Sequence, residues 1–139
     1  MIQLIVGDKG KGKTKVLLDK VNTEVKSIPG NTVYLDKSAK HMYELNNKIR
    51  LIDVSEFSFG SSDEFVGFIC GIISQDHDLQ RMYFDSFLRI ACLENQNISP
   101  VISKLEDLSE KFGVDFVICI SMNEDVLPEN AKSKVIVAL

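Results

Sequence analysis

The sequence has few of the residues that build disulfides and metal sites. Its 139 residues include three cysteines and two histidines. Cys70, Cys92 and Cys119 lie among apolar neighbours without C-x-x-C spacing, so we expect reduced core residues. His41 and His77 are distant in the chain from each other and from any cysteine cluster. A disulfide-stabilised secreted protein and a zinc protein are therefore both disfavoured.

Long apolar runs and an excess of positive charge are also missing. No stretch approaches the ~20 apolar residues that a membrane-spanning helix needs, and the chain does not begin like a signal peptide. The formal net charge is −4 and the pI is about 5.2, which argues against a broad nucleic-acid surface. We therefore expect a cytoplasmic protein, with residues 1–139 forming a single domain and no membrane or nucleic-acid partner.

One segment does carry a specific signal. Residues 7–14 match the phosphate-binding loop pattern G-x-x-x-x-G-K-[ST] at every fixed position. An apolar run at 2–6 precedes the loop, and apolar residues at helical spacing follow it over 13–26. Strand, loop and helix is the order that this motif requires, so the sequence predicts a nucleotide site. The expected nucleotide-binding residues are Gly7, Asp8, Lys9, Gly10, Lys11, Gly12, Lys13 and Thr14.

The residues of the loop predict its chemistry. Backbone N–H groups freed by the glycines would surround an anion, and the following helix would present its positive end to the phosphates. Lys13 is expected to reach the β- and γ-phosphates, and the Thr14 hydroxyl to hold Mg²⁺. Lys9 and Lys11 add local positive potential. Asp8 stands where some P-loop switches carry a second lysine that crosses a dimer interface, so that subgroup is not matched.

The rest of the chain alternates strand patterns with helical patterns. Strands are expected at 32–35, 49–54, 79–84, 114–120 and 135–139, and helices at about 38–45, 61–74, 86–95 and 99–113. This alternation predicts an α/β fold, with a mainly parallel sheet of about five to six strands flanked by helices. Ligands of such sheets bind at the carboxyl ends of the strands.

A carboxylate at a strand end is expected to complete the Mg²⁺ shell. Asp36, Asp53 and Asp85 compete for this role, and Asp85 is favoured because Met82 to Phe84 form an apolar run directly before it. Ser121 would either sense the γ-phosphate or simply end its strand.

The base that would activate water is not placed by the sequence. Many P-loop ATPases have a glutamate after this aspartate, but Ser86 follows Asp85 here. Three glutamates that loops could bring near remain open: Glu56, Glu94 and Glu124. Any of the three arginines could serve a neighbouring subunit as an arginine finger, or else be solvated or paired on the surface: Arg50, Arg81 and Arg89.

The loop, the helix at 65–70 and the strand end at 83–85 resemble the P-loop NTPase superfamily. The chain looks like a group of short bacterial P-loop proteins described as ATP-binding or likened to twitching-motility ATPases. This resemblance implies an ATP-type ligand and Mg²⁺. Full twitching-motility motors have an extra N-terminal domain and His and Asp boxes with no counterpart here, so the resemblance does not imply a motor.

Three functional hypotheses follow from the sequence. The first is an ATP-binding protein with slow Mg²⁺-dependent hydrolysis, which switches its association with itself or with a protein partner. The second is a small-molecule kinase in which Asp36 or Asp53 orients an acceptor hydroxyl. The third is a non-catalytic, nucleotide-bound interaction module, which Ser86 supports. ATP is favoured over GTP because no N-K-x-D guanine motif is present.

Overall fold

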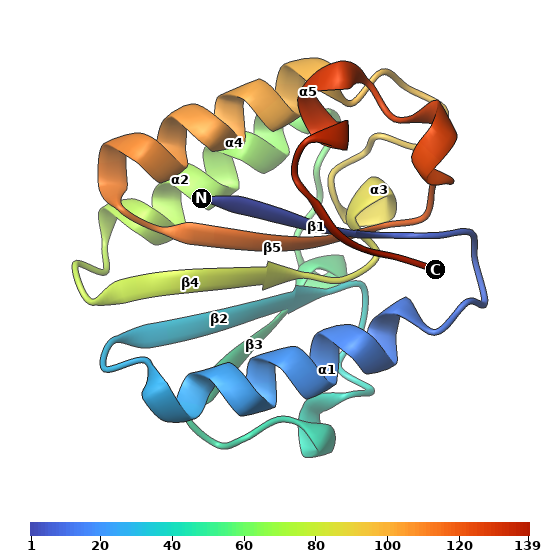
Figure 1. Ribbon diagram of the computed structural model, residues 1–139. Coiled ribbons are helices and arrows are strands. Elements are labelled where there is room, and N and C mark those ends of the chain that lie inside the picture. Colours follow the sequence, from blue (N-terminus) through green and yellow to red (C-terminus); the bar gives the residue numbers. More distant parts are fainter.

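Six parallel strands form the centre of the computed structural model, which describes residues 1–139 (Figure 1). Their order across the sheet is β3-β2-β4-β5-β1-β6, and every neighbouring pair is parallel. The predicted α/β fold is confirmed. The strands are β1 (Ile2–Val6), β2 (Asn31–Asp36), β3 (Ile49–Asp53), β4 (Leu79–Phe84), β5 (Asp115–Ile120) and β6 (Val135–Ala138).

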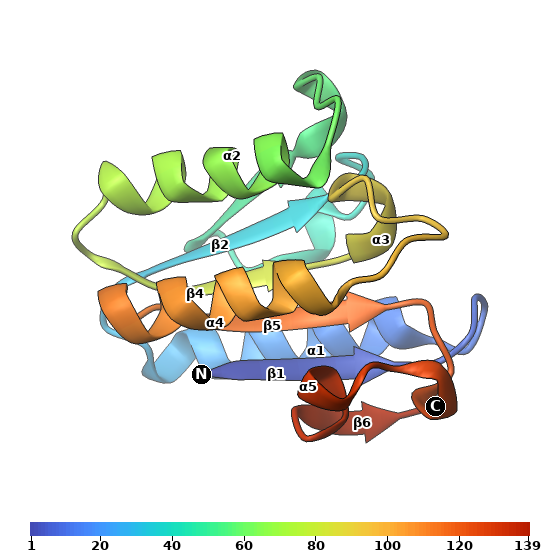
Figure 2. The same cartoon turned by 90° about the horizontal axis from the view of Figure 1, so that it is seen from above.

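Helices cover both faces of the sheet. The helix that follows β1 lies on one face, and two long helices lie side by side on the other (Figures 1 and 2). Parallel strands require crossover connections, which is why helices alternate with strands along the chain. The helices are α1 (Lys13–Glu24), α2 (Ser62–Ser74), α3 (Phe87–Ile90), α4 (Ser99–Phe112) and α5 (Glu129–Lys132).

Side chains that alternate along the central strands build two separate cores. Val117 faces α1, whereas its neighbours Phe116 and Ile118 face α2 and α4. All three are fully buried, as expected for a strand with helices on both faces. Tyr83 and Phe84 divide in the same way between the two faces. The central strands are therefore fixed in register, and so are the residues at their carboxyl ends.

The helix ends largely match the sequence signals. Ser61 caps α2, because its hydroxyl accepts a hydrogen bond from the Glu64 N–H at 3.3 Å. The Glu64 side chain accepts in turn from the Gly60 N–H at 2.6 Å. Gly113 ends α4 in the left-handed conformation, with φ of 67°. Ser99 before Pro100 is a pattern typical of an N-cap, but α4 begins at Ser99 itself and has no side-chain cap.

Three expected segments differ in length. Residues 38–45 form only a 3-10 turn at Met42–Glu44, because Tyr43 is 92% exposed and offers no apolar face to bury. Residues 86–95 contain a single helical turn, α3, and Cys92 then leaves the helical region with φ of 58°. The first helix ends at Glu24, where a 3-10 turn over Val25–Ser27 replaces its expected last residues.

Candidate functional site

The phosphate-binding loop joins the end of β1 to the start of α1. It lies at the end of the sheet where all the strands terminate (Figure 2). Gly10 and Gly12 have φ of 80° and 92°, a region that favours glycine over residues with a Cβ. Gly12 directly precedes α1. The glycines therefore let the chain turn sharply onto the helix, whose positive end faces the loop.

Lys13 folds back over its own loop. Its Nζ donates a hydrogen bond to the Asp8 backbone oxygen at 3.0 Å, and the residue is only 8% exposed. Lys13 makes no ion pair with an acidic side chain. Its charge is thus held at the loop and is not neutralised by another protein group. Thr14 follows in the first turn of α1 and is half-buried.

Two buried aspartates lie next to each other at the carboxyl ends of neighbouring strands. Asp36 ends β2 and Asp85 follows β4, and these strands are paired through Leu35 and Phe84. The Asp85 N–H donates to the Leu35 backbone oxygen at 2.9 Å, which extends the pairing to the two acids. Asp36 is 2% and Asp85 4% exposed.

Each of these acids has a different set of partners. Asp85 accepts from the Tyr34 hydroxyl at 3.1 Å and from the Ser86 N–H at 2.9 Å. Asp36 accepts from the Lys37 N–H at 2.7 Å through Oδ1, but its buried Oδ2 has no partner. Burial, and then the charge of Asp85, raises the pKa of Asp36 to about 6. A buried oxygen without a partner is a place where a bound ligand can supply the missing contact.

Cys119 connects the loop to the two acids. It lies on β5, the strand between β1 and β4. Its thiol is within 3.7 Å of the Lys13 backbone oxygen. Burial raises the pKa of this thiol, as does Asp85, whereas Lys13 lowers it and Asp36 raises it further. The charges of Lys13 and of the two acids therefore all act on this thiol near the end of β5.

The three cysteines differ in environment. All three are free, but only Cys119 is buried, whereas Cys70 is exposed on α2 and Cys92 is half-buried. The expectation that all three are core residues is therefore wrong for Cys70. Apolar neighbours in the sequence did not separate the buried from the exposed side of an amphipathic helix.

Asp53 lies apart from the loop. It ends β3, the edge strand farthest from β1 on that side of the sheet. Its carboxylate accepts from the Ser55 N–H at 3.0 Å and from the Ser55 hydroxyl at 2.6 Å. Asp53 thus caps the turn that follows its own strand, and the structure does not bring it to Lys13.

A cavity of about 250 Å³ opens beside the loop at the ends of the strands. It contains Ser121 and one of the three candidate glutamates, Glu94, together with one of the three arginines, Arg89. Spacing could not distinguish these residues from their competitors. The full lining is Lys9, Lys37, Ser86, Leu88, Arg89, Glu94, Asn95 and Ser121.

The competing residues lie elsewhere. Glu56 and Arg50 line a groove beside β3, and Glu124 begins an exposed 3-10 turn. Arg81 pairs with Glu24 at 2.9 Å and with Asp115 at 3.4 Å. Arg81 is thereby held in a structural ion-pair network, because its guanidinium is already shared between two carboxylates.

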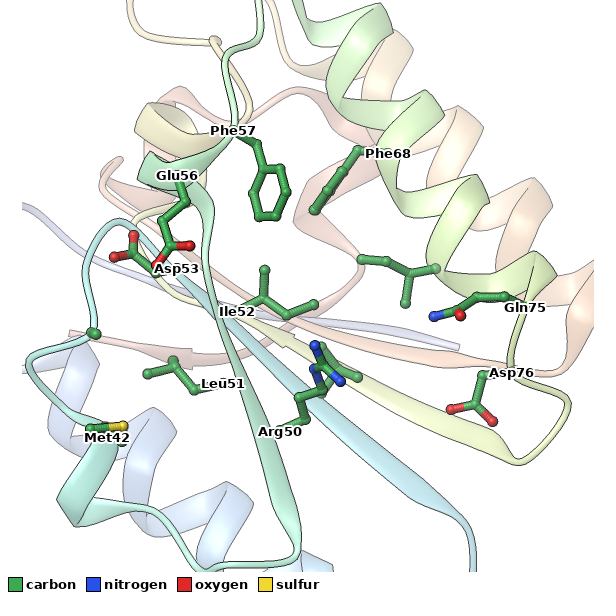
Figure 3. A pocket seen from close by; sticks show the side chains of 13 residues that line it. Met42, Arg50, Leu51, Ile52, Asp53, Glu56, Phe57, Phe68, Gln75 and Asp76 are labelled. Carbon is green, nitrogen blue, oxygen red and sulfur yellow. The ribbon is translucent and has the colours of Figure 1, made fainter.

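The groove beside β3 is larger and more apolar than the cavity at the loop. Figure 3 shows Phe57 and Phe68 on one side of it and Ile52 and Arg50 along the strand. Its volume is about 460 Å³, and it includes no residue of the phosphate-binding loop. Its volume and its apolar lining are features of a small-molecule site. The loop glycines, Lys13 and the two buried acids all lie outside this groove.

Metal ligands are sparse throughout the molecule. No three His, Cys, Asp or Glu side chains come together as a ready metal cluster. A cation held by Thr14 and Asp85 would therefore need phosphate oxygens or water as its other ligands. None of the helices has both the length and the apolar character to cross a membrane.

Comparison with known proteins supports the fold. No protein-family model and no curated protein sequence matches the chain. Among solved structures, the fold is similar to that of a KaiC-like protein from the hyperthermophilic archaeon Pyrococcus horikoshii OT3, with a TM-score of 0.65 and 18% sequence identity. The match covers 95% of this chain and 66% of the other, so this chain spans just under two thirds of that protein's length. The α/β architecture is thus shared with a KaiC-like protein.

Proposed function

We propose that this protein is a cytoplasmic switch that binds ATP with Mg²⁺ at the loop 7–14 and hydrolyses it slowly. The observation that carries this proposal is Lys13, which is held over a glycine-rich loop without an acidic partner. The fold shared with a KaiC-like protein is compatible with this function. The resemblance to short bacterial ATP-binding proteins, likened to twitching-motility ATPases, stays a prediction.

The residues around the loop have distinct roles in this proposal. Lys13 and the backbone N–H groups from Gly7 to Thr14 bind the phosphates. The Thr14 hydroxyl and the Asp85 carboxylate are hard oxygen donors, which suits Mg²⁺. When bound, Mg²⁺ would neutralise the charge that develops on the phosphates. We assign the γ-phosphate contact to Ser121, which directly follows β5 and lines the same cavity as Lys9.

Hydrolysis requires a proton acceptor. The water oxygen bonds to the γ-phosphorus, the bond from that phosphorus to the bridging oxygen breaks, and ADP leaves. Glu94 is the candidate glutamate that shares a cavity with Ser121. We therefore propose that the Glu94 carboxylate accepts the proton that the attacking water loses. Glu94 is exposed and Ser86 follows Asp85 directly, so no glutamate is fixed next to the metal carboxylate. Slow turnover follows from this loose placement.

Ligand-induced stabilisation tests the binding step. If the dissociation constant is micromolar, millimolar Mg-ATP should stabilise the protein by about 4 kcal/mol through linkage. Thermal unfolding would be recorded with Mg-ATP, with Mg-GTP and without ligand, for the natural chain and for Lys13→Ala. A melting temperature that no nucleotide changes would contradict the proposal. If the protein binds Mg-ATP but releases phosphate only at the background rate, the non-catalytic interaction module would replace the hydrolase as the proposed function.

A partner is needed for a switch to have an output. We propose that ATP binding changes association with a second copy of the chain or with another protein, because turnover alone would serve no signalling role. Sedimentation of the protein with Mg-ADP and with a non-hydrolysable Mg-ATP analogue tests self-association directly. Identical sedimentation in both states, with no partner captured in either, would remove the switch from the proposal.

A further inference from the structure

The cavity beside the loop carries an unusual concentration of free positive charge. Lys9 comes from the phosphate-binding loop, Lys37 follows β2, and Arg89 lies on α3. None of the three makes an ion pair. Glu94 is the one acid in the lining, and Leu88 the one hydrophobic residue. We call this the basic cavity. Its surface suits a polar, negatively charged ligand.

One wall of the basic cavity is built in a strained conformation. Ser86, Cys92 and Asn95 have φ of 52°, 58° and 60°, and they are the only residues other than glycine with positive φ in the protein. All three lie within the ten residues 86–95 that form this wall. Backbone strain of this kind persists where the surroundings enforce it, and it gathers at functional sites.

The surroundings do enforce this wall. Phe87, Ile90 and Leu93 are buried in the core, which fixes the segment from below. The Leu93 N–H donates to the Leu88 backbone oxygen at 2.8 Å, and the Ile90 N–H donates to the Ser86 oxygen at 3.0 Å. The backbone that carries Arg89 and Glu94 is therefore held in place before any ligand arrives. Such preorganisation lowers the cost of binding.

The basic cavity lies beside the phosphate-binding loop and not within it. Its lining includes Lys9 and Ser121 but neither Lys13 nor Thr14. Lys37 and Ser86 place it over the ends of β2 and β4, whereas the loop follows β1. β5 separates β1 from β4, so the basic cavity and the loop lie over different strand ends, and the terminal phosphate proposed to contact Ser121 would lie at the edge of the cavity.

We propose that the basic cavity binds a second ligand, a small molecule that carries phosphate or carboxylate groups, beside the nucleotide. Three cations from three separate elements provide the charge-assisted hydrogen bonds that such groups require. The volume of about 250 Å³ is below the ~300 Å³ at which pockets for drug-sized ligands begin, so the ligand is a compact metabolite and not a second nucleotide. This inference does not depend on ATP binding, because the cavity has its own charges.

Titration with inorganic phosphate, followed by backbone amide NMR, tests the proposal. The protein would be held at constant ionic strength and titrated free, with saturating Mg-ADP, and with a non-hydrolysable Mg-ATP analogue. We expect shifts at residues 86–95 in all three titrations. Arg89→Gln and Lys37→Gln should each weaken phosphate binding about tenfold or more, since each removes a charge-assisted contact.

Arg50→Gln is the matched control. Arg50 is also exposed and without an ion pair, but it lines the groove beside β3. Its replacement should leave phosphate binding within about twofold, and Arg89→Gln should leave the affinity for the Mg-ATP analogue equally unchanged. Displacement of phosphate by the analogue would overturn the proposal, because the cavity would then hold only the γ-phosphate of the nucleotide and no second ligand. Absence of shifts at 86–95, or equal weakening by Arg50→Gln, would also overturn it. If the protein does not bind nucleotide, the phosphate titration of the nucleotide-free protein still tests the basic cavity. Failure of the proposed function can therefore be distinguished from failure of this proposal.

Discussion

Asp36 and Asp85 lie next to each other in the structure although 48 residues separate them in the sequence. Both are buried at the carboxyl ends of adjacent strands, and only Asp85 has a side-chain donor, the Tyr34 hydroxyl. Two buried carboxylates at such a position cannot both be ionised without cost. The pair therefore stores an electrostatic penalty that a cation or a proton relieves.

The first prediction concerns pH. The pKa of Asp36 rises from 3.8 to about 6 on folding, so the folded protein holds a proton that the unfolded chain has released between about pH 4 and pH 6. Stability should therefore fall as the pH rises through this window, with no penalty below it and the full penalty above it. A shift of this size corresponds to roughly 3 kcal/mol. Urea unfolding at pH 4 and at pH 7.5, both at ~25 °C, would measure this change in the free energy of unfolding.

Asp36→Asn isolates this effect from other titrating groups. The amide has no charge, so the stability of the variant relative to the natural chain should improve by roughly 3 kcal/mol between the two pH values. Asp78→Asn, on the exposed turn before β4, is the control for loss of one negative charge. If the difference in stability between Asp36→Asn and the natural chain does not change with pH, folding does not raise the pKa of Asp36.

The second prediction concerns the metal carboxylate. Asp85→Asn keeps the shape of the side chain but weakens it as a ligand for Mg²⁺, so the gain in nucleotide affinity on adding Mg²⁺ should fall about tenfold or more. Asp53→Asn should leave that gain unchanged, because Asp53 caps its own turn at the edge strand. Nucleotide titrations with and without Mg²⁺ would measure both.

Tyr34→Phe is the structural control for this experiment. It removes the hydrogen bond to Asp85 but keeps the carboxylate, so it should lower stability more than Mg²⁺ dependence. If Asp53→Asn removed the Mg²⁺ dependence while Asp85→Asn did not, the assignment of the metal carboxylate to β4 would be wrong.

The sequence was sufficient for the fold and for the loop, because both depend on local patterns. Segments with strand patterns alternate with segments of helical spacing, and this alternation predicted the parallel α/β sheet. The apolar run before Asp85 correctly indicated a central strand. Residues 38–45 were assigned wrongly because weak local propensity, without an apolar face, does not sustain a helix.

The contacts around the loop could not be predicted, because they depend on strand order and on local backbone strain. Nothing near Asp36 in the sequence indicates that Asp85 will adjoin it. Glu94 could not be separated from Glu56 by spacing, since its position follows from the early end of α3 and from the positive φ of Cys92. Ser86 and Cys92 are of types that carry no signal for that conformation in a single sequence, whereas Asn95 is of a type that adopts it more often.

The third prediction concerns Lys13. Lys13→Ala should raise the dissociation constant for Mg-ATP roughly 10- to 100-fold, since a hydrogen bond to a charged group contributes about 1.5–3 kcal/mol. Lys15→Ala is the matched control, because Lys15 is exposed on α1 and pairs only loosely with Asp19 at 4.0 Å. Fluorescent nucleotide titration would measure both, and equal effects would mean that Lys13 acts only through general charge.

The last prediction separates backbone conformation from packing in the loop. A Cβ at Gly12 would meet no atom within 4 Å, yet φ of 92° lies where residues with a side chain are strained. Gly12→Ala should therefore destabilise the protein by about 1–2 kcal/mol without any steric clash. Gly67 also has open space around it but lies inside α2, so Gly67→Ala should stabilise by up to about 1 kcal/mol. Thermal or urea unfolding of the two variants would show opposite signs for the same substitution. A neutral Gly12→Ala would mean that the free loop relaxes to a conformation open to any residue, and the phosphate cradle would then form only when a nucleotide binds.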